Sequence, residues 1–162
     1  MTTVKVSVVI DRPPAHVWEE LRDIAAHVNW MADAEAITFT SAVREGVGTT
    51  FDCVTKLGPL RVTDKMVVTE WKDGESIAVR HEGIVTGVGR FTLKRKRGDV
   101  TQFTWEERLM FPPRMGGAVG AAVAAPIFRR VWRKNLANLK AVVEGPGDPP
   151  PPPAAPHPWS PG

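Results

Sequence analysis

Six strand-like segments follow one another through the middle of this sequence, and a single long amphipathic helix comes after them. The segments span residues 35–43, 48–56, 60–71, 76–82, 86–94 and 100–110. Glycine-containing turns such as Glu45-Gly46 and Gly58-Pro59 separate them. Consecutive strands joined by short turns predict an antiparallel meander. Residues 4–10 are rich in β-branched side chains and supply a seventh strand ahead of the meander.

Two short helices are expected between this first strand and the meander. Asp11 precedes Pro13 and Pro14. Asp favours the N-cap position of a helix, and Pro is tolerated in the first turn. The first helix should therefore start directly after Asp11, and residues 25–30 should form the second.

The long helix is expected over residues 118–143, after the flexible Gly116-Gly117 pair. Pro126 should kink it near Ala122, because proline lacks a backbone donor and clashes with the preceding turn. No other element could cover the concave face of such a long sheet, so helix and sheet must enclose large side chains or a ligand. The buried stripe of the helix is predicted to be Phe128, Val131, Trp132, Asn135, Leu139 and Val142, with Leu136 on its flank.

Composition changes at residue 145, where the chain becomes rich in Gly and Pro and includes five consecutive prolines. Such a segment cannot form a packed core, so residues 145–162 are expected to be a disordered tail and residues 1–144 a single domain. Residues 149–158 could dock in an aromatic-lined groove of another protein. The alternative is a solubilising tail without a partner.

Charge and cysteine content argue against several classes of protein. The formal net charge is +3 and the densest basic cluster, residues 94–97, falls at an expected hairpin tip, so no nucleic-acid partner is expected. A lone cysteine excludes an intramolecular disulfide, and the histidines show no metal-ligand spacing, so neither a metal nor another cofactor is expected. Residues 115–128 are too short for a membrane span, and residues 1–5 lack the apolar run of a signal peptide. A cytoplasmic monomer or weak dimer is expected.

Strand alternation predicts which side chains face the concave side of the sheet. In residues 100–110 the more apolar face carries one carboxylate, Glu107, and burial there should disfavour its ionised form. Asp64 also falls on an inward face, although it could instead pair with Lys65 or Arg61 or face outward. The inward residues of the other strands are Phe51, Cys53, Thr55, Val62, Asp64, Met66, Val68, Ile77, Val79, His81, Gly87, Gly89, Phe91 and Leu93.

Turn positions predict the register of the last three strands. A turn at residues 83–85 and another at 96–98 would give the pairs His81–Gly87, Val79–Gly89, Gly87–Glu107, Gly89–Trp105 and Phe91–Phe103. His81, Gly87 and Glu107 would then share one row, with His81 and Glu107 about 10 Å apart. The two glycines are interpreted as the floor of a cavity, or alternatively as bulge or twist glycines.

Five stretches carry a resemblance to a known family: residues 8–18, Asn29-Trp30, 46–49, 98–105 and 129–140. They resemble the START-like superfamily, whose helix-grip fold is shared with the birch-pollen allergen, and in particular its bacterial polyketide cyclase/dehydrase-type branch. The similarity covers about residues 3–144. It implies an α+β helix-grip fold, with a curved seven-stranded antiparallel sheet wrapped around the long C-terminal helix. Because the family includes carriers, cyclases and hydroxylase domains, the resemblance implies no family-wide catalytic residue.

Three functions are compatible with these features. The first is binding of a hydrophobic small molecule (a lipid, polyketide or aromatic compound) by a carrier or binding protein. The second is a polyketide cyclase/dehydrase-like enzyme in which Glu107 and His81 transfer protons, with Asp64 and Arg90 as further candidates. The third is a regulatory or interaction role.

The ligand-binding residues are expected to line a cavity entered under the long helix near Pro126. Cys53 has no activating partner and is expected to be buried and inert. The predicted set is Phe51, Cys53, Asp64, Met66, Val79, His81, Gly87, Gly89, Phe91, Phe103, Trp105, Glu107, Ile127 and Val131.

Overall fold

A computed structural model describes residues 1–145 of the chain. The segment expected to be a disordered tail lies, from residue 146 onward, outside the described residues. The elements are β1 (Thr2–Ile10), α1 (Pro14–Arg22), the 3-10 helix η1 (Ile24–Asn29), β2 (Ala34–Phe39), β3 (Thr50–Leu57), β4 (Leu60–Lys72), β5 (Ser76–Glu82), β6 (Thr86–Lys96), β7 (Val100–Met110), the 3-10 turn η2 (Pro113–Met115) and α2 (Gly117–Glu144).

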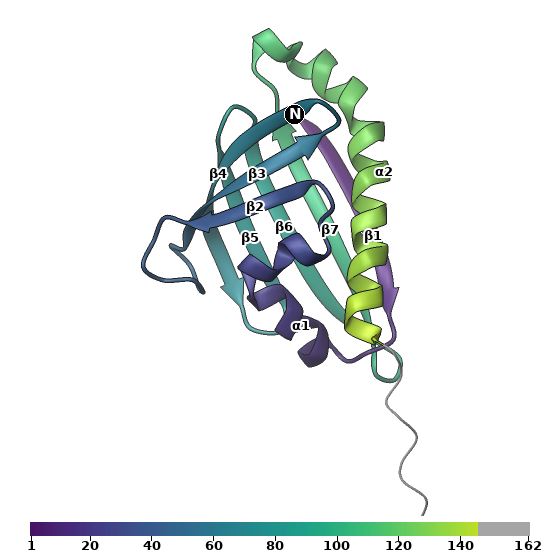
Figure 1. Cartoon of the computed structure of the whole chain (residues 1–162). Helices are drawn as coiled ribbons and strands as arrows, with labels where there is room; N and C mark the ends of the chain where they lie inside the picture. Colours follow the sequence, from purple (N-terminus) through teal and green to yellow (C-terminus); the bar gives the residue numbers. More distant parts are fainter. Residues whose placement is uncertain (146–162) are drawn as a thin grey trace, which may run out of the picture.

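All seven strands form one antiparallel sheet, in the order β1-β7-β6-β5-β4-β3-β2. Figure 1 shows the sheet curling around α2, with α1 and η1 at one end. The predicted α+β helix-grip architecture is therefore confirmed. Among residues 1–145, no helix combines the length and apolar composition that crossing a bilayer requires.

The start of α1 differs from the prediction that Asp11 caps it. The helix begins at Pro14, and the N-cap residue Pro13 offers no side-chain hydrogen bond. Asp11 lies too early to reach the first turn. Its backbone N–H instead donates to the Glu144 carboxylate at 2.8 Å.

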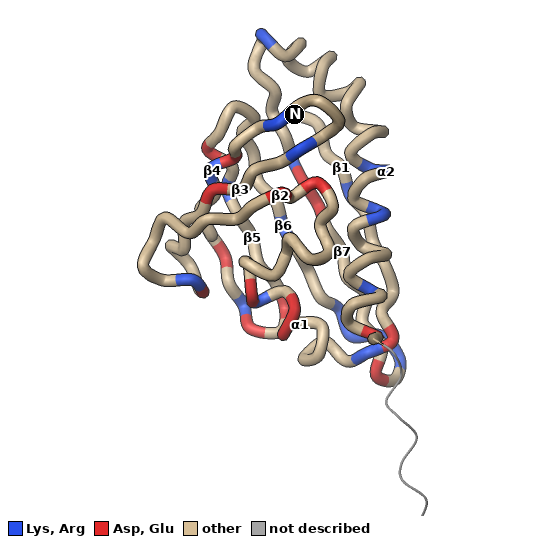
Figure 2. Tube along the Cα trace, in the orientation of Figure 1, with Lys and Arg blue, Asp and Glu red and all other residues tan. Residues whose placement is uncertain are grey.

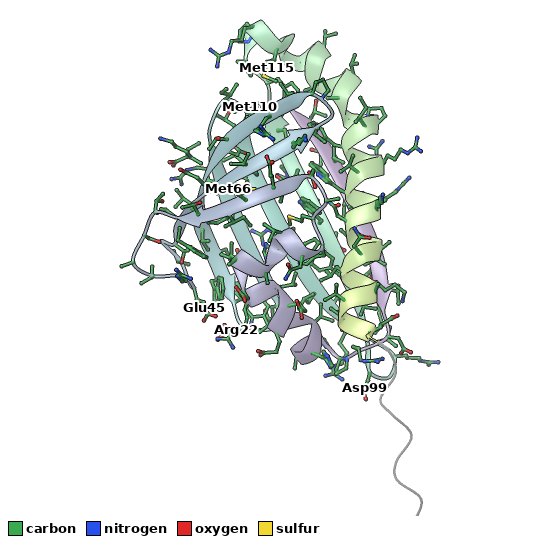
Figure 3. All side chains as sticks on the ribbon, in the orientation of Figure 1. Arg22, Glu45, Met66, Asp99, Met110 and Met115 are labelled. Atoms are coloured by element: carbon green, nitrogen blue, oxygen red, sulfur yellow. The ribbon has the colours of Figure 1, made fainter. Side chains whose placement is uncertain are left out.

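Strand β2 is also shorter than expected, because it ends at Phe39. The loop that follows is held against α1 by Arg22, which donates to Glu45 at 2.9 and 3.1 Å. Both side chains are labelled in Figure 3.

The predicted β5–β6 register is confirmed, but the β6–β7 register is wrong by two residues. His81 pairs with Gly87 as expected, whereas Glu107 pairs with Gly89 rather than Gly87. The turn consists of residues 97–99, with Gly98 in its centre at φ +70°, rather than residues 96–98. Moving a turn by one residue shifts the partner of each residue by two positions. Because side chains alternate between the two faces with a period of two, the residues predicted to face inward still do so. The other pairs predicted for these strands are replaced by Leu93–Phe103, Phe91–Trp105 and Gly87–Leu109.

Helix α2 packs along the open side of the sheet, mainly against β1. The predicted stripe is wrong at its C-terminal end, where Val142 is 42% exposed and Val143 is buried instead. Leu136, predicted on the flank, is also buried. Leu136, Leu139 and Val143 recur at helical spacing, so they form the continuous seam that faces the core. Pro126 lies inside the helix, and Figure 1 shows the N-terminal turns of α2 inclined to the rest.

The C-terminal end of α2 is fixed to the end of β1 by hydrogen bonds. The Arg12 guanidinium donates to the Glu144 carbonyl at 2.6 Å, and the Lys140 ammonium donates to the Val9 carbonyl at 2.8 Å. These bonds satisfy carbonyls at a helix end and a strand end. They fix one end of the helix that covers the sheet.

Candidate ligand cavity and its polar cluster

A cavity of about 600 Å³ lies between the concave face of the sheet, η1 and α2. This volume falls within the range of small-molecule sites. Two lining residues are labelled in Figure 3, namely Met66 of β4 and Met115 of η2. The lining is mostly apolar and includes Ile24, Met31, Ile37, Phe51, Leu57, Leu60, Val62, Met66, Ile77, Val79, Val85, Phe91, Trp105, Leu109, Phe111, Met115, Ile127, Phe128, Val131 and Trp132.

All but two of the ligand-binding residues expected from the sequence line this cavity. One exception is Phe103, which is fully buried behind the wall, with its ring centroid 5.3 Å from that of Phe91. The other is Gly87, whose backbone lies against β7. A Cβ at Gly87 would lie 1.9 Å from the Arg108 carbonyl oxygen, and its φ of +147° disfavours any side chain. Gly87 therefore fits the bulge or twist interpretation, not the cavity floor.

Three acidic and basic side chains meet on the cavity wall in a continuous hydrogen-bonded cluster. His81 of β5 contacts Asp64 of β4 through Nδ1 (2.7 Å to Oδ2) and Glu107 of β7 through Nε2 (2.9 Å to Oε2). The indole N–H of Trp105 donates to the other Glu107 oxygen at 2.8 Å. We call Asp64, His81 and Glu107 the polar cluster. His81 and Glu107 are only 7% and 5% exposed.

Glycines make this cluster possible. Strand β6 lies between β5 and β7, and the side chains of His81 and Glu107 meet across it. At Gly89 a Cβ would lie 2.4–2.7 Å from the Glu107 carboxyl atoms, so that carboxylate occupies the space a side chain would need. At Gly83 a Cβ would lie 2.6 Å from Oδ1 of Asp64. Gly89 thus faces the cavity as predicted, but Glu107 fills the space above it.

The carboxylates determine the protonation state of His81. Burial alone would lower the pKa of this imidazole. Hydrogen bonds to Asp64 and Glu107, together with their negative charges, outweigh burial and raise the pKa of His81 to about 10. At neutral pH both ring nitrogens are therefore protonated, and both donate to carboxylates. No ring nitrogen of His81 is left to accept a proton.

The other titratable side chains on the lining contribute little positive charge. Burial lowers the pKa of His27 to about 4 and raises that of the Cys53 thiol to about 11, so both are neutral at pH 7. The expectation that Cys53 is buried is confirmed. Arg90 lies mainly on the outer face and donates to Glu70 at 2.9 and 3.1 Å. Asp33 adds a further carboxylate, which accepts a hydrogen bond from Asn135 at 2.6 Å.

Aromatic rings connect the polar cluster to the helix that covers it. Trp105 stacks on Trp132 of α2 at 4.7 Å between ring centroids, and Trp132 stacks on Phe128 at 5.2 Å. Phe91 meets Trp105 edge to face at 5.3 Å. Such pairs contribute about 0.5–1.5 kcal/mol each beyond area burial, so this wall holds α2 next to the cluster.

Residues 1–144 match the family model described as polyketide cyclase / dehydrase and lipid transport. The chain belongs to this family. No curated protein matches the chain.

Among the residues described, none of the His, Cys, Asp and Glu side chains form a group of three or more arranged to hold a metal ion.

Solved structures with the same fold support the architecture of this polyketide cyclase/dehydrase and lipid transport domain. A protein from Thermus thermophilus is 18% identical with a TM-score of 0.75, covering 88% of this chain and 97% of that one. The Zhui aromatase/cyclase from Streptomyces sp. R1128 is 18% identical with a TM-score of 0.67, covering 88% and 93%. A conserved protein from Geobacillus kaustophilus is 13% identical with a TM-score of 0.71, covering 88% and 95%. At these identities the likeness shows the fold alone.

Several lining residues of this family member were not predicted as ligand-binding. Trp132 and Phe128 were recognised as buried helix residues, but no sequence signal indicated that they face a cavity rather than a packed core. Asp33 follows η1 in a loop, where no periodicity indicates the direction of a side chain. The hydrogen bond from Asn135 to Asp33 depends on tertiary packing that no local signal reveals.

The cavity mouth is marked by lining residues that are also exposed to solvent. Leu60, the first residue of β4, is 51% exposed, and Ile127 of α2 is 57% exposed. Figure 2 shows that the N-terminal turns of α2 carry no charged residue. The expected entrance near Pro126 is consistent with this position.

Proposed function

We propose that this domain binds a hydrophobic small molecule in the cavity between the sheet and α2, as a carrier or binding protein. The observation that supports this most directly is a cavity of about 600 Å³ whose wall is apolar except for a few polar groups. Burying an apolar ligand there would remove its surface from water, a gain of about 25 cal/mol per Å² before the costs of association. The polar cluster would orient the ligand.

The proposal is tested by filling the cavity from β4. Val62 lines the cavity, and the neighbouring Thr63 is exposed on the opposite face of the same strand. Val62→Trp should raise the Kd of a neutral apolar dye such as Nile red at least about tenfold, because the indole would occupy the ligand space. Thr63→Trp, which adds the same bulk outside the cavity, should leave the Kd unchanged. Both variants should retain the far-UV circular dichroism spectrum of the unmodified chain.

Equal dye binding by the two variants, both folded, would count against the cavity as the binding site. Native mass spectrometry of freshly purified protein complements the dye experiment. A co-purified hydrophobic compound, lost from Val62→Trp and kept in Thr63→Trp, would identify the ligand.

A second function is favoured by the contact between Glu107 and His81. An ion pair beside an apolar cavity could move protons during cyclisation or dehydration of a bound polyketide, as the family description suggests. Since both nitrogens of His81 are engaged, Glu107 would be the group that exchanges a proton. Recovery of the co-purified compound unchanged after incubation supports the carrier, whereas its conversion supports the enzyme.

A further inference from the structure

The polar cluster offers hydrogen-bond acceptors to a ligand and almost no donors. The His81 ring has two N–H donors and the neighbouring Trp105 indole has one, and all three are directed at carboxylate oxygens of the cluster. Each carboxylate oxygen has two lone pairs. Both oxygens of Glu107 therefore keep unused acceptor capacity after accepting one bond each.

Asp64 adds acceptor capacity to the same part of the wall. Its Oδ2 bonds to His81, while its Oδ1 is buried against Gly83 and has no hydrogen-bond partner among residues 1–145. A buried polar atom that lacks a partner is destabilising, because it has lost its hydrogen bonds to water. The Asp64 carboxylate therefore has few compensating donors, and it adds negative charge to the wall beside Glu107.

Net charge acts in the same direction as hydrogen bonding. The polar cluster holds two carboxylates against one imidazolium, and Asp33 places a third carboxylate on the lining. The guanidinium of Arg90 is already paired with Glu70, and His27 is neutral at pH 7. The Thr55 hydroxyl can both donate and accept, so it discriminates little between ligands. The cavity is therefore electrostatically negative, and a second anion would enter a desolvated site against like charges.

We propose that the cavity selects apolar compounds whose polar end donates a hydrogen bond, namely an alcohol, phenol or amine, and rejects carboxylates with the same carbon skeleton. This inference rests on the proposed ligand-binding function and specifies the ligand class. The donor of the ligand would lie against Glu107, and its apolar part would extend along the aromatic wall toward the mouth.

Four compounds with the same ten-carbon chain test the proposal on the unmodified full-length protein, by displacement of Nile red at pH 7. Decan-1-ol and decylammonium can donate, decyl methyl ether can only accept, and decanoate accepts and is anionic. Both donors should displace the dye at concentrations at least about tenfold below the ether, with decanoate the weakest, since one hydrogen bond to a charged group supplies that ratio. The order of decan-1-ol and decylammonium shows whether alcohols or amines are preferred.

Two results separate this inference from the proposed function. Decan-1-ol binding no better than the ether, with the dye itself bound, would overturn the donor requirement and leave the cavity function standing. Failure of the dye and all four compounds to bind would overturn both.

Glu107→Gln provides a variant test, because the amide replaces one acceptor oxygen by a donor. It should reduce the decylammonium-to-decanoate affinity ratio at least about tenfold, and an unchanged ratio in the folded variant would contradict the role of Glu107. Asp64→Asn gives an independent second variant, should Glu107→Gln fail to fold. The same reduction is expected for Asp64→Asn, and an unchanged ratio there would equally contradict the inference.

Discussion

The carboxylate of Glu107 occupies the space next to Gly89 that a side chain would otherwise fill. This explains a glycine in the middle of a long strand, where glycine normally weakens the sheet. It also explains how two side chains on strands that are not neighbours can meet over the strand between them. The polar cluster can thus form only because residue 89 has no side chain.

Gly89→Ala should destabilise the protein by about 1–3 kcal/mol, because the added Cβ would lie 2.4 Å from Oε1 of Glu107. In the Glu107→Ala background the same change should be neutral or stabilising, since the clash is removed and alanine costs less conformational entropy than glycine. A double-mutant cycle from urea unfolding measures the difference. Additive effects of the two substitutions would show that Gly89 and Glu107 do not interact in this way.

The protonation of His81 gives a second prediction at this scale. The pKa of His81 rises from 6.5 to about 10 on folding, so its stabilising contribution is complete below pH 6.5 and lost as the pH rises through about 10. Between these values the free energy of unfolding should fall by at most about 1.4 kcal/mol per pH unit. In His81→Gln this slope should be absent, as measured by urea unfolding at intervals between the two pKa values. Parallel curves for the two proteins would contradict a protonated His81.

Sequence patterns located the individual members of the polar cluster but not their contacts. Alternation placed Glu107, His81 and Asp64 on the concave face, and all three line the cavity. Lys65 and Arg61 were alternative partners for Asp64, yet both have odd numbers in the same strand and so lie on its opposite face. The 2.9 Å contact between His81 and Glu107 depends on side-chain direction and on the β6–β7 register. Because the turn was predicted one residue too early, that register was predicted incorrectly.

At the scale of elements, the strands were predicted well because their turns are chemically distinct. Ser76–Glu82 and Val100–Met110 have the expected bounds, since Gly and Asp residues flank three of their four ends and Pro112 follows the fourth. Strand β2 ends early because residues 40–49 form a loop fixed partly by Arg22, a contact distant in sequence. The predicted helix stripe fails at Val142 because burial at the end of α2 depends on its attachment to β1.

The corrected face of α2 is tested by a pair of substitutions three residues apart. Leu139 is fully buried, so Leu139→Ala should cost about 2–5 kcal/mol through lost burial and a residual cavity. Val142 is 42% exposed, so Val142→Ala should change the stability by less than about 0.5 kcal/mol. Guanidinium unfolding of both variants gives the comparison. A larger loss for Val142→Ala would restore the stripe predicted from periodicity.

For the whole molecule, a curled sheet with one covering helix predicted an enclosed space, but not whether side chains would fill it. The answer depends on packing details, such as the stacking of Trp132 on Trp105 and the position of Glu107 over Gly89. The volume of about 600 Å³ is the sum of many such details. No single residue pattern encodes that volume.

The polar cluster draws its members from β4, β5 and β7 alone, whereas the apolar lining comes from nearly every element of the fold. The residues that would bind the polar end of a ligand are therefore a different set from those that would contact its carbon skeleton. Substitutions at Met31, Ile37 or Val131 can reshape the hydrophobic space while Asp64, His81 and Glu107 stay unchanged. Such a division would allow the shape of the accepted carbon skeleton to change through the apolar positions while the polar cluster is retained.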